Sequence, residues 1–360
     1  MKSDRLILQL KLRMLILKSA VIVFILTCVI IIMLPMFTTK DLEYRSIFVI
    51  HCFNQRSLRL KDGELLLEEE DANGRMKTLT KFPFQKILAL FIVGNVTLTS
   101  PLIEKCRKFD VAIVVMKLSL RPVFFFSIPA EANFLLRAKQ YAYDKKEMNL
   151  PVALVRLKIE SQRLNLQKSK RKDALTLTAV RCCDNALKVL PYCNNLKALL
   201  GIEGFVAKNY FAAYFQDFSW YCRCPRLKSD YINVVLDIGY TVLFNLVEVY
   251  LRLFGFDLYV GVYHQLWFKR KSLVCDLVEP FRPIIDHRVR VALNRKEIKK
   301  TDFEKRRSEY YPKSDTAKML YIMFFDTLIP YKNDLFRFVQ GYYRVFMNDQ
   351  PGVKLPSISR

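Results

Sequence analysis

Short apolar runs separated by turn residues fill the chain between residues 44 and 127. The runs ILALFIV, VAIVVMKL and PVFFFSI are rich in Val, Ile and Phe, which is typical of buried β-strands. The runs SLRL and ELLLEEE flank the segment KDG at 61–63, and Asp-Gly between two such runs predicts a hairpin turn. One short helix is expected among the strands, with Ser100 as its N-cap and Pro101 at its first position.

The hydrophobic period changes to that of helices after about residue 129. The segments EANFLLRAKQYAYDKK, 152–168 and DALTLTAVRCCDNALKVL carry apolar residues at steps of three and four. The same pattern continues in GIEGFVAKNYFAAYF and YINVVLDIGYTVLFNLVEVYLRLFG. We therefore predict an α+β protein, with a strand-rich domain at 36–128, a linker-helix region at 129–150 and a mostly α-helical domain at 151–360.

The N-terminal segment before this body has a different character. Between Lys18 and Lys40 lie 21 residues without a charge, which is long enough to span a bilayer as a helix. Five basic residues precede it, so the positive-inside rule would keep the N-terminus in the cytoplasm. Two interpretations stay open for residues 1–35: an anchor or export signal, or a mis-assigned start with the folded protein beginning at Met36.

Composition adds charge and redox information to this picture. The chain has 58 Lys and Arg against 34 Asp and Glu, a formal net charge of +24, which favours a polyanionic partner such as nucleic acid or an anionic membrane. Solvated basic faces are the alternative explanation. The nine cysteines form no pair of CxxC knuckles, which argues against a structural zinc site and indicates free thiols in a reducing compartment. We expect a cytoplasmic protein.

Candidate chemistry comes from a few acids and one histidine in apolar helical settings. Glu203 is flanked by two glycines and followed by an aromatic run, a setting in which a carboxylate would be partly buried and would need a partner. The simplest alternative to a functional role is a salt bridge to a local base such as Lys208. Asp276 and Glu279 are three residues apart, on one helical face, and follow His264 across a basic loop. One imidazole with two or three carboxylates suits Mn²⁺ or Mg²⁺. The phosphate-binding loop GxxxxGK[ST] is absent from the sequence.

Several separated motifs together resemble one known family. The stretches GIEGFVAKNYF, INVVLDIGYTVLFNLV, GFDLYVGVYHQ and KSLVCDLVEPFRPIIDHRVRVALNRKEI match, in order and spacing, the CRISPR-associated spacer-acquisition integrases, also described as CRISPR-associated protein one. The resemblance extends back through FIVGNVTLTSPLIEKC and covers roughly residue 44 to the C-terminus. It does not account for residues 1–35.

The resemblance implies a function and a set of site residues. It implies a divalent metal, Mg²⁺ or Mn²⁺, held by Glu203, His264 and Glu279, with Asp276 as a further catalytic acid. The reaction would join captured double-stranded DNA to a CRISPR repeat array by attack of a 3′ hydroxyl, in antiviral defence. The implied partners are a second copy, through the strand-rich domain, and a small ferredoxin-like acquisition protein that bridges two dimers. Phosphate contacts are expected from basic residues near these positions: Lys208, Lys269, Arg270, Lys271, Arg282, Arg288 and Arg290.

Two departures from the family pattern bear on the site. Position 208 is Lys where the family usually has Arg, which keeps the charge but loses bidentate geometry. Pro280 follows Glu279 directly and predicts a kink, which we expect to leave Glu279 facing the metal. A non-catalytic basic DNA-binding subunit, in which the acids only form salt bridges, and a membrane-anchored protein remain as alternative functions.

Overall fold

The computed structural model describes residues 43–52, 56–71, 73–117, 122–127, 133–144, 146–347 and 355–356. By contact the chain divides into two units, 1–38 and 39–360, and all the described residues belong to the second. The apolar segment before Lys40 lies outside the described residues, so both interpretations of it stay predictions.

An antiparallel sheet of three strands contains the predicted hairpin. The strands β2 (Arg56–Lys61) and β3 (Glu64–Glu70) pair directly, and β4 (Met76–Pro83) pairs with the other edge of β3. Asp62 and Gly63 form the turn with φ angles of 52° and 79°. Left-handed conformations at both central residues are what a two-residue hairpin with native twist requires, which confirms the Asp-Gly prediction.

A second sheet has the strand order β1-β5-β6-β7. Its first three strands are parallel and the fourth is antiparallel, over the ranges β1 Ser46–Cys52, β5 Ile87–Gly94, β6 Ala112–Met116 and β7 Pro122–Phe126. The interior strands β5 and β6 are almost entirely buried, which explains why they read as continuous apolar runs. Helix α3 (Ser100–Lys108) connects them, and its N-cap is Thr99, one residue before the predicted cap.

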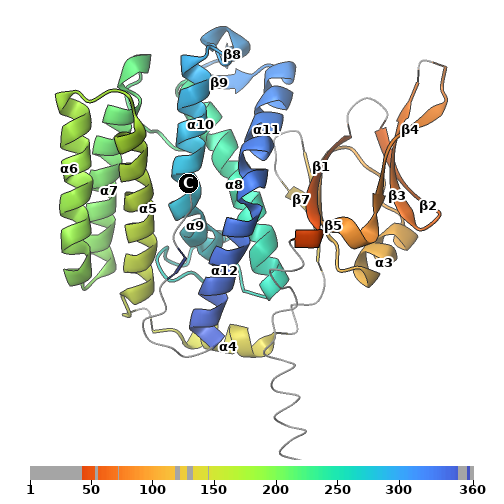
Figure 1. Cartoon of the computed structure of the whole chain (residues 1–360), viewed down its shortest axis with the longest axis horizontal. Coiled ribbons are helices and arrows are strands. Elements are labelled where there is room, and N and C mark those ends of the chain that lie inside the picture. The colour runs from red at the N-terminus through yellow and green to blue at the C-terminus, as the bar shows by residue number, and fades with distance from the viewer. Residues whose placement is uncertain are drawn as a thin grey trace, which may run out of the picture. The chain divides into compact units, whose positions relative to one another are not determined.

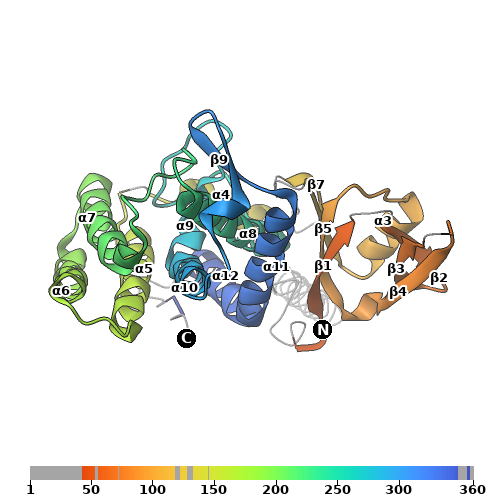
Figure 2. The same ribbon diagram turned by 90° about the horizontal axis from the view of Figure 1, so that it is seen from above.

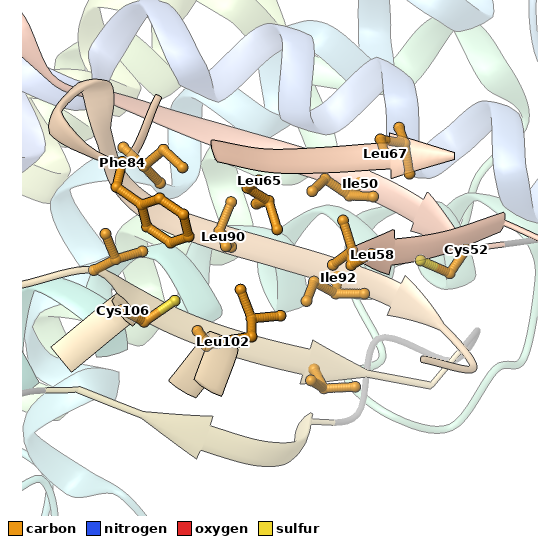
Figure 3. Packing of buried hydrophobic residues seen from close by; sticks show 14 residues of the cluster. Ile50, Cys52, Leu58, Leu65, Leu67, Phe84, Leu90, Ile92, Leu102 and Cys106 are labelled. Atoms are coloured by element: carbon orange, nitrogen blue, oxygen red, sulfur yellow. The ribbon is translucent and has the colours of Figure 1, made fainter. Parts of the chain in front are cut away.

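One apolar cluster joins the two sheets and α3. Figure 3 shows Leu65 of β3 and Leu90 of β5 among side chains that point toward each other, with Leu102 of α3 nearby. Leu65 and Leu90 are fully buried. Truncating such a side chain to Ala typically costs about 2–5 kcal/mol. This core makes the strand-rich part a packed body.

The first helices of the second part stand side by side (Figures 1 and 2). A short helix, α4 (Phe134–Ala142), lies within the predicted linker region. Three longer helices then pack on one another: α5 Asn149–Lys168, α6 Ala174–Val189 and α7 Leu196–Tyr214. Asp173 and Asn195 cap α6 and α7, each accepting a hydrogen bond from a backbone N–H of the first turn.

The remaining helices surround α8 (Tyr231–Phe254), which the sequence marks by its long apolar pattern. Within the described part of the chain, only α8 has the length and hydropathy of a membrane span, and 72% of its apolar window is buried. Core helices share those properties, so this is weak evidence for a span. Its neighbours are α9 Ser272–Val278, α10 Arg282–Asn294, α11 Ser314–Leu328 and α12 Lys332–Met347.

The predicted α+β class is confirmed, because strands precede a mostly helical region. The hairpin of β8 (Phe303–Arg306) and β9 (Glu309–Pro312) between α10 and α11 was not predicted. The helical part begins at Asn149, two residues before the expected boundary.

Candidate active site

The ammonium of Lys158 joins two carboxylates that come from distant parts of the chain. Its Nζ donates to Oε1 of Glu203 and, at 2.6 Å, to Oε2 of Glu279. Lys158 projects from the middle of α5, which packs against both α7 and the 3₁₀ turn Glu279–Phe281. Only 10% of the Lys158 side chain and 5% of the Glu279 side chain are exposed, so the charges meet away from bulk water.

Charge neutralisation keeps these buried groups ionised. Burial alone would raise the pKa of Glu279, but Arg282 and Lys158 outweigh it and lower the pKa to about 2. Burial likewise opposes the charged form of Lys158, yet Glu279 and Glu203 raise its pKa. Arg282 lies 3.2 Å from Glu279, measured from Nη2 to Oε1. Glu279 is therefore a carboxylate whose negative charge is matched by cations.

Tyr263 supplies a second contact to Glu203. Its hydroxyl donates to Oε2, so one carboxylate oxygen faces Lys158 and the other faces a phenol. Burial and the charge of Glu203 raise the pKa of Tyr263, which keeps the phenol protonated as a donor. Glu203 is thus held from two sides.

Asp276 accepts hydrogen bonds from the loop that carries His264. Its Oδ2 accepts from the backbone N–H groups of Val262 at 2.7 Å and Tyr263 at 3.0 Å, and its Oδ1 accepts from that of His264 at 2.8 Å. Gly261 makes this approach possible, because a Cβ there would lie 2.5 Å from Oδ2 of Asp276. The fully buried carboxylate therefore anchors the loop to α9.

The same carboxylate orients the imidazole of His264. Nδ1 of His264 lies 2.7 Å from Oδ1 of Asp276. A carboxylate at that distance favours a proton on Nδ1, which leaves the Nε2 lone pair available as a ligand or base. His264 also lines a pocket of about 320 Å³ together with Leu196 and the segment 261–266.

The chain bends at Pro280, as predicted. Helix α9 ends at Val278, a 3₁₀ turn spans Glu279–Phe281, and α10 starts afresh at Arg282. The bend places the Glu279 side chain against Lys158 and so opposite Glu203. Whether Glu279 faces a metal stays a prediction.

A family comparison places the whole chain in a known family. The model of the family "CRISPR associated protein Cas1" matches residues 50–324. The chain belongs to the Cas1 family. A CRISPR-associated endonuclease Cas1 from Thermodesulfovibrio yellowstonii is 30% identical over 62% of this chain and 74% of its own. One from Methanospirillum hungatei is 25% identical over 79% of each.

Solved structures share the fold at low sequence identity. A casposase bound to an integration product superposes with a TM-score of 0.69 at 18% identity, covering 88% of this Cas1 chain and 95% of its own. A Cas1 protein from Thermotoga maritima gives a TM-score of 0.67 at 17% identity, covering 84% and 98%. The family model confirms the predicted family, and the solved structures confirm the fold.

The described part of this Cas1 protein holds no group of three or more His, Cys, Asp and Glu placed to bind a metal. Glu203 and Glu279 meet through Lys158, whereas His264 is held by Asp276. The proposed local pair of Glu203 with Lys208 is wrong, since the cation comes from α5. The metal-ligand set itself stays a prediction.

The seven basic residues predicted to contact phosphate fall into two groups, according to whether they form an ion pair with an acid of this chain. Four already contact acids: Lys271 with Glu248, Arg282 with Glu279, Arg288 with Glu297, and Arg290 with Asp217. Lys208 and Lys269 are exposed and Arg270 is half-buried. The last three are the better candidates for a phosphate, because none of them forms an ion pair with an acid in the described part of the chain.

Lys158 and Tyr263 were missed by sequence reasoning. A signal existed for Lys158, because the apolar residues Leu154 and Val155 lie one turn before it on the same side of the helix. A lysine at a buried helical position requires a buried acid. Tyr263 directly precedes His264, and nothing in the local pattern distinguishes it from a core tyrosine.

Proposed function

We propose that this Cas1 protein is a metal-dependent DNA integrase and endonuclease that inserts captured DNA into a CRISPR repeat array. One observation carries the proposal: a half-buried carboxylate, Glu203, and a buried one, Glu279, converge on one cation although 76 residues of chain separate them. Burying paired charges away from water is costly and adds little stability on its own. Such a site is more readily explained by chemistry than by folding.

The residues fit a divalent cation by the chemistry of their donor atoms. Carboxylate oxygens and one imidazole nitrogen are the ligands that Mg²⁺ and Mn²⁺ accept. Glu203, Glu279 and Nε2 of His264 would hold the ion, and Lys158 would have to yield its contacts or share them. When bound, such an ion supplies Lewis-acid stabilisation of a phosphodiester.

The protein's own groups supply orientation and charge. Asp276 fixes the tautomer and direction of His264, so a lone pair rather than an N–H is presented. Lys158 and Arg282 place positive charge beside the carboxylates, where a phosphate under in-line attack by a DNA 3′ hydroxyl gathers negative charge. This chemistry requires no covalent protein nucleophile, because the nucleophile belongs to the DNA.

The solved relatives support DNA and a second Cas protein as partners. Solved relatives include a Cas6-RT-Cas1–Cas2 complex and a casposase bound to its integration product. We propose that this protein acts as a homodimer with a small ferredoxin-like acquisition partner on double-stranded DNA. The net charge of +24 supports a nucleic-acid substrate. A cytoplasmic location suits the eight described cysteines, which are free thiols.

Strand transfer tests the proposal directly. A labelled DNA duplex is incubated with a supercoiled repeat-bearing plasmid, the acquisition partner, Mn²⁺ and either wild-type protein or His264→Ala. We expect the variant to lose at least about 100-fold in integration, because losing even an outer-shell partner costs about 10- to 100-fold. DNA binding in EDTA should be retained. His287→Ala is the matched control, since that histidine contacts Tyr214 away from the acids.

A non-catalytic DNA-binding subunit is the second candidate, because Lys158 already pairs with both carboxylates. If the acids exist only to pair with this lysine, His264→Ala integrates as well as the wild type. The proposal would then be rejected.

A further inference from the structure

Two cysteines separated by one residue hold their sulfurs in contact on the loop 219–230, which leads into α8. The Sγ atoms of Cys222 and Cys224 lie 3.3 Å apart, and one thiol donates a hydrogen bond to the other. Both residues are half-buried, so part of each remains open to solvent. Neighbouring thiols of this kind either bind a thiophilic metal or exchange with a disulfide.

The distance between the sulfurs favours a disulfide over a metal. Two thiolates on one tetrahedral zinc ion lie roughly 3.8 Å apart, given a Zn–S bond of about 2.3 Å. Sulfurs at 3.3 Å are closer than that and need a smaller approach to reach the S–S bond of about 2.05 Å. In the described part of the chain, moreover, no third His, Cys, Asp or Glu joins them in a group that could hold an ion. Disulfides that form in a reducing compartment are usually transient and redox-sensing.

A buried amide fixes the backbone of both cysteines. Asn233 lies fully buried in the first turn of α8. Its Oδ1 accepts from the N–H of Cys224 at 2.9 Å, and its Nδ2 donates to the carbonyl of Cys222 at 3.0 Å. Pro225 also disfavours helical backbone at Cys224. The two sulfurs are therefore held facing each other before any reaction occurs.

The rest of the loop carries backbone strain. Ser219, Arg226 and Lys228 have φ angles of 51°, 66° and 48°, left-handed values that cost energy in residues with a Cβ. A contact with α8 helps to hold them, because the N–H of Arg226 donates to Oδ2 of Asp237 at 2.9 Å. Strained segments of this kind are typical of switch regions.

Arg223, between the two cysteines, connects the loop to the candidate active site. Its guanidinium pairs with Asp237 and lies 5.3 Å from the centroid of the Tyr240 ring. Arg282 lies 4.8 Å from the same centroid and pairs with Glu279. A movement of Arg223 would therefore change the packing of the cation beside Glu279.

We propose that Cys222 and Cys224 form a redox-active pair that a small disulfide, such as glutathione disulfide, converts into an intramolecular disulfide, and that closure acts on the candidate active site through Arg223. Closure places the backbone of Arg223 inside a small ring, so the guanidinium cannot keep all its present contacts. The thiol chemistry is independent of the proposed function, whereas its effect on the active site rests on that function.

The reaction is a two-step exchange. The hydrogen bond to Cys224 raises the pKa of the Cys222 thiol, which favours Cys224 as the attacking sulfur. Its thiolate attacks the small disulfide, forms a mixed disulfide and releases one glutathione thiolate, which takes up a proton. Cys222 then loses its proton, attacks the mixed disulfide and releases the second glutathione. Two protein thiols are oxidised by two electrons, and one small disulfide is reduced to two thiols.

Equilibration of full-length protein in glutathione buffers tests the thiol chemistry. Free thiols are blocked with iodoacetamide at each ratio of glutathione disulfide to glutathione, and the remaining cysteines are then reduced and labelled with N-ethylmaleimide. Trypsin cuts after Arg223, so the two cysteines are read on separate peptides, 209–223 and 224–226. Intact mass separates an internal disulfide, which removes two hydrogens, from a mixed disulfide, which adds glutathione.

Both cysteines should oxidise together without retaining glutathione. Because the second step is intramolecular, the ratio needed should be at least about tenfold below that at which Cys193 takes up glutathione. Cys222→Ser should instead keep glutathione on Cys224, since no second thiol displaces it. Cys193→Ser is the matched control, because it removes a half-buried thiol outside the loop and should leave the pair unchanged. Asn233→Asp cannot donate to the Cys222 carbonyl and should raise the ratio for half-oxidation about two- to tenfold, the equivalent of one hydrogen bond.

Strand transfer by oxidised and reduced protein tests the action on the active site. Oxidation should lower integration by about 2- to 30-fold, the range of couplings carried through packed side chains. The double variant Cys222→Ser with Cys224→Ser should integrate equally in both buffers. That result separates the pair from Cys275, a half-buried thiol on α9.

Each contrary result overturns a stated part of the inference. A pair that stays reduced where Cys193 is already modified would mean a static hydrogen bond. Zn²⁺ retained by wild type but not by Cys222→Ser, with no disulfide formed after zinc removal, would assign the pair to a metal. A disulfide with unchanged strand transfer would reject the link through Arg223. A disulfide with no strand transfer in either redox state would reject the proposed function while leaving the thiol chemistry in place.

Discussion

Replacing Lys158 by Met should remove the ammonium that neutralises the two carboxylates of the candidate active site. The thermal stability of the protein should then depend on a divalent cation. The substitution keeps most of the side-chain volume within α5 but removes the only charge that touches both Glu203 and Glu279 in the described structure. Arg282 would remain beside Glu279, and among the described residues Glu203 would keep its phenol contact with Tyr263. The half-buried Glu203 and the buried Glu279 would then have no cation that bridges them.

The magnitude follows from the cost of breaking a buried ion pair. Removing one partner typically costs about 3–5 kcal/mol, because the remaining charge is buried without compensation. An unfolding entropy of about 2.1 cal/mol/K per residue over about 300 ordered residues converts this cost into a Tm decrease of about 5–8 °C. A divalent cation at about 100 times its Kd would return about 2.7 kcal/mol, or about 4 °C.

The assay is thermal unfolding, which measures both the Tm decrease and its recovery. It compares wild type, Lys158→Met and Lys158→Arg, each in EDTA and in Mn²⁺. We expect Lys158→Met to be the least stable in EDTA and to gain more from Mn²⁺ than the wild type, since no ammonium competes for the carboxylates. Lys158→Arg keeps the charge and controls for the loss of packing. Equal Tm values for Lys158→Met and wild type in EDTA, or an equal response of both to Mn²⁺, would refute the reasoning.

Three further outcomes are expected. Burial raises the pKa of Asp286 to about 6, so the folded state binds this proton more tightly than the unfolded chain does. This proton therefore adds about 3 kcal/mol to the free energy of unfolding below about pH 4, and that stabilisation is lost as the pH rises through 6. The Tm difference between wild type and Asp286→Asn, measured across pH 4–7, should show this loss. Gly261→Ala should lower Tm by an amount equivalent to about 1–3 kcal/mol and reduce integration, because the new methyl overlaps Asp276; unchanged Tm would contradict the close approach. In salt titrations of DNA binding, Lys269→Ala should reduce the slope of log K against log salt by about 0.9, whereas Lys271→Ala should leave it unchanged, because its ammonium is held by an acid of α8.

Local patterns were sufficient for most of the fold. The turn at Asp62 and Gly63 was predictable because only a few residue types accept two left-handed conformations in succession. The β8–β9 hairpin carries no such signal: its left-handed residue is Arg307, with a φ angle of 56°, and neither Gly nor Asn stands there. The shift of the α3 cap from Ser100 to Thr99 has a similar cause, since both residues are good caps and lie side by side.

Long-range contacts account for what the sequence could not show at the site. Lys158 reaches an acid 45 positions away and another 121 positions away, and no window of sequence contains all three. The nearby alternative, Lys208, lies five residues after Glu203 on α7, about 140° around the helix, so the two side chains diverge. Helical periodicity is enough to exclude that pair, but it cannot indicate that the cation comes from α5.

Asp276 and Glu279, the two acids of the DLVE segment, have different surroundings. Asp276 lies inside α9, where its two oxygens accept four hydrogen bonds: three from backbone N–H groups and one from His264. A carboxylate has about four acceptor sites, so little capacity remains for another ligand without leaving a buried N–H unpaired. Glu279 lies one turn later, directly before Pro280, and within the described part of the chain its oxygens contact the cationic side chains of Lys158 and Arg282. The contacts therefore fit Asp276 as the residue that positions His264, and Glu279 as the acid whose partners a metal and a phosphate would replace.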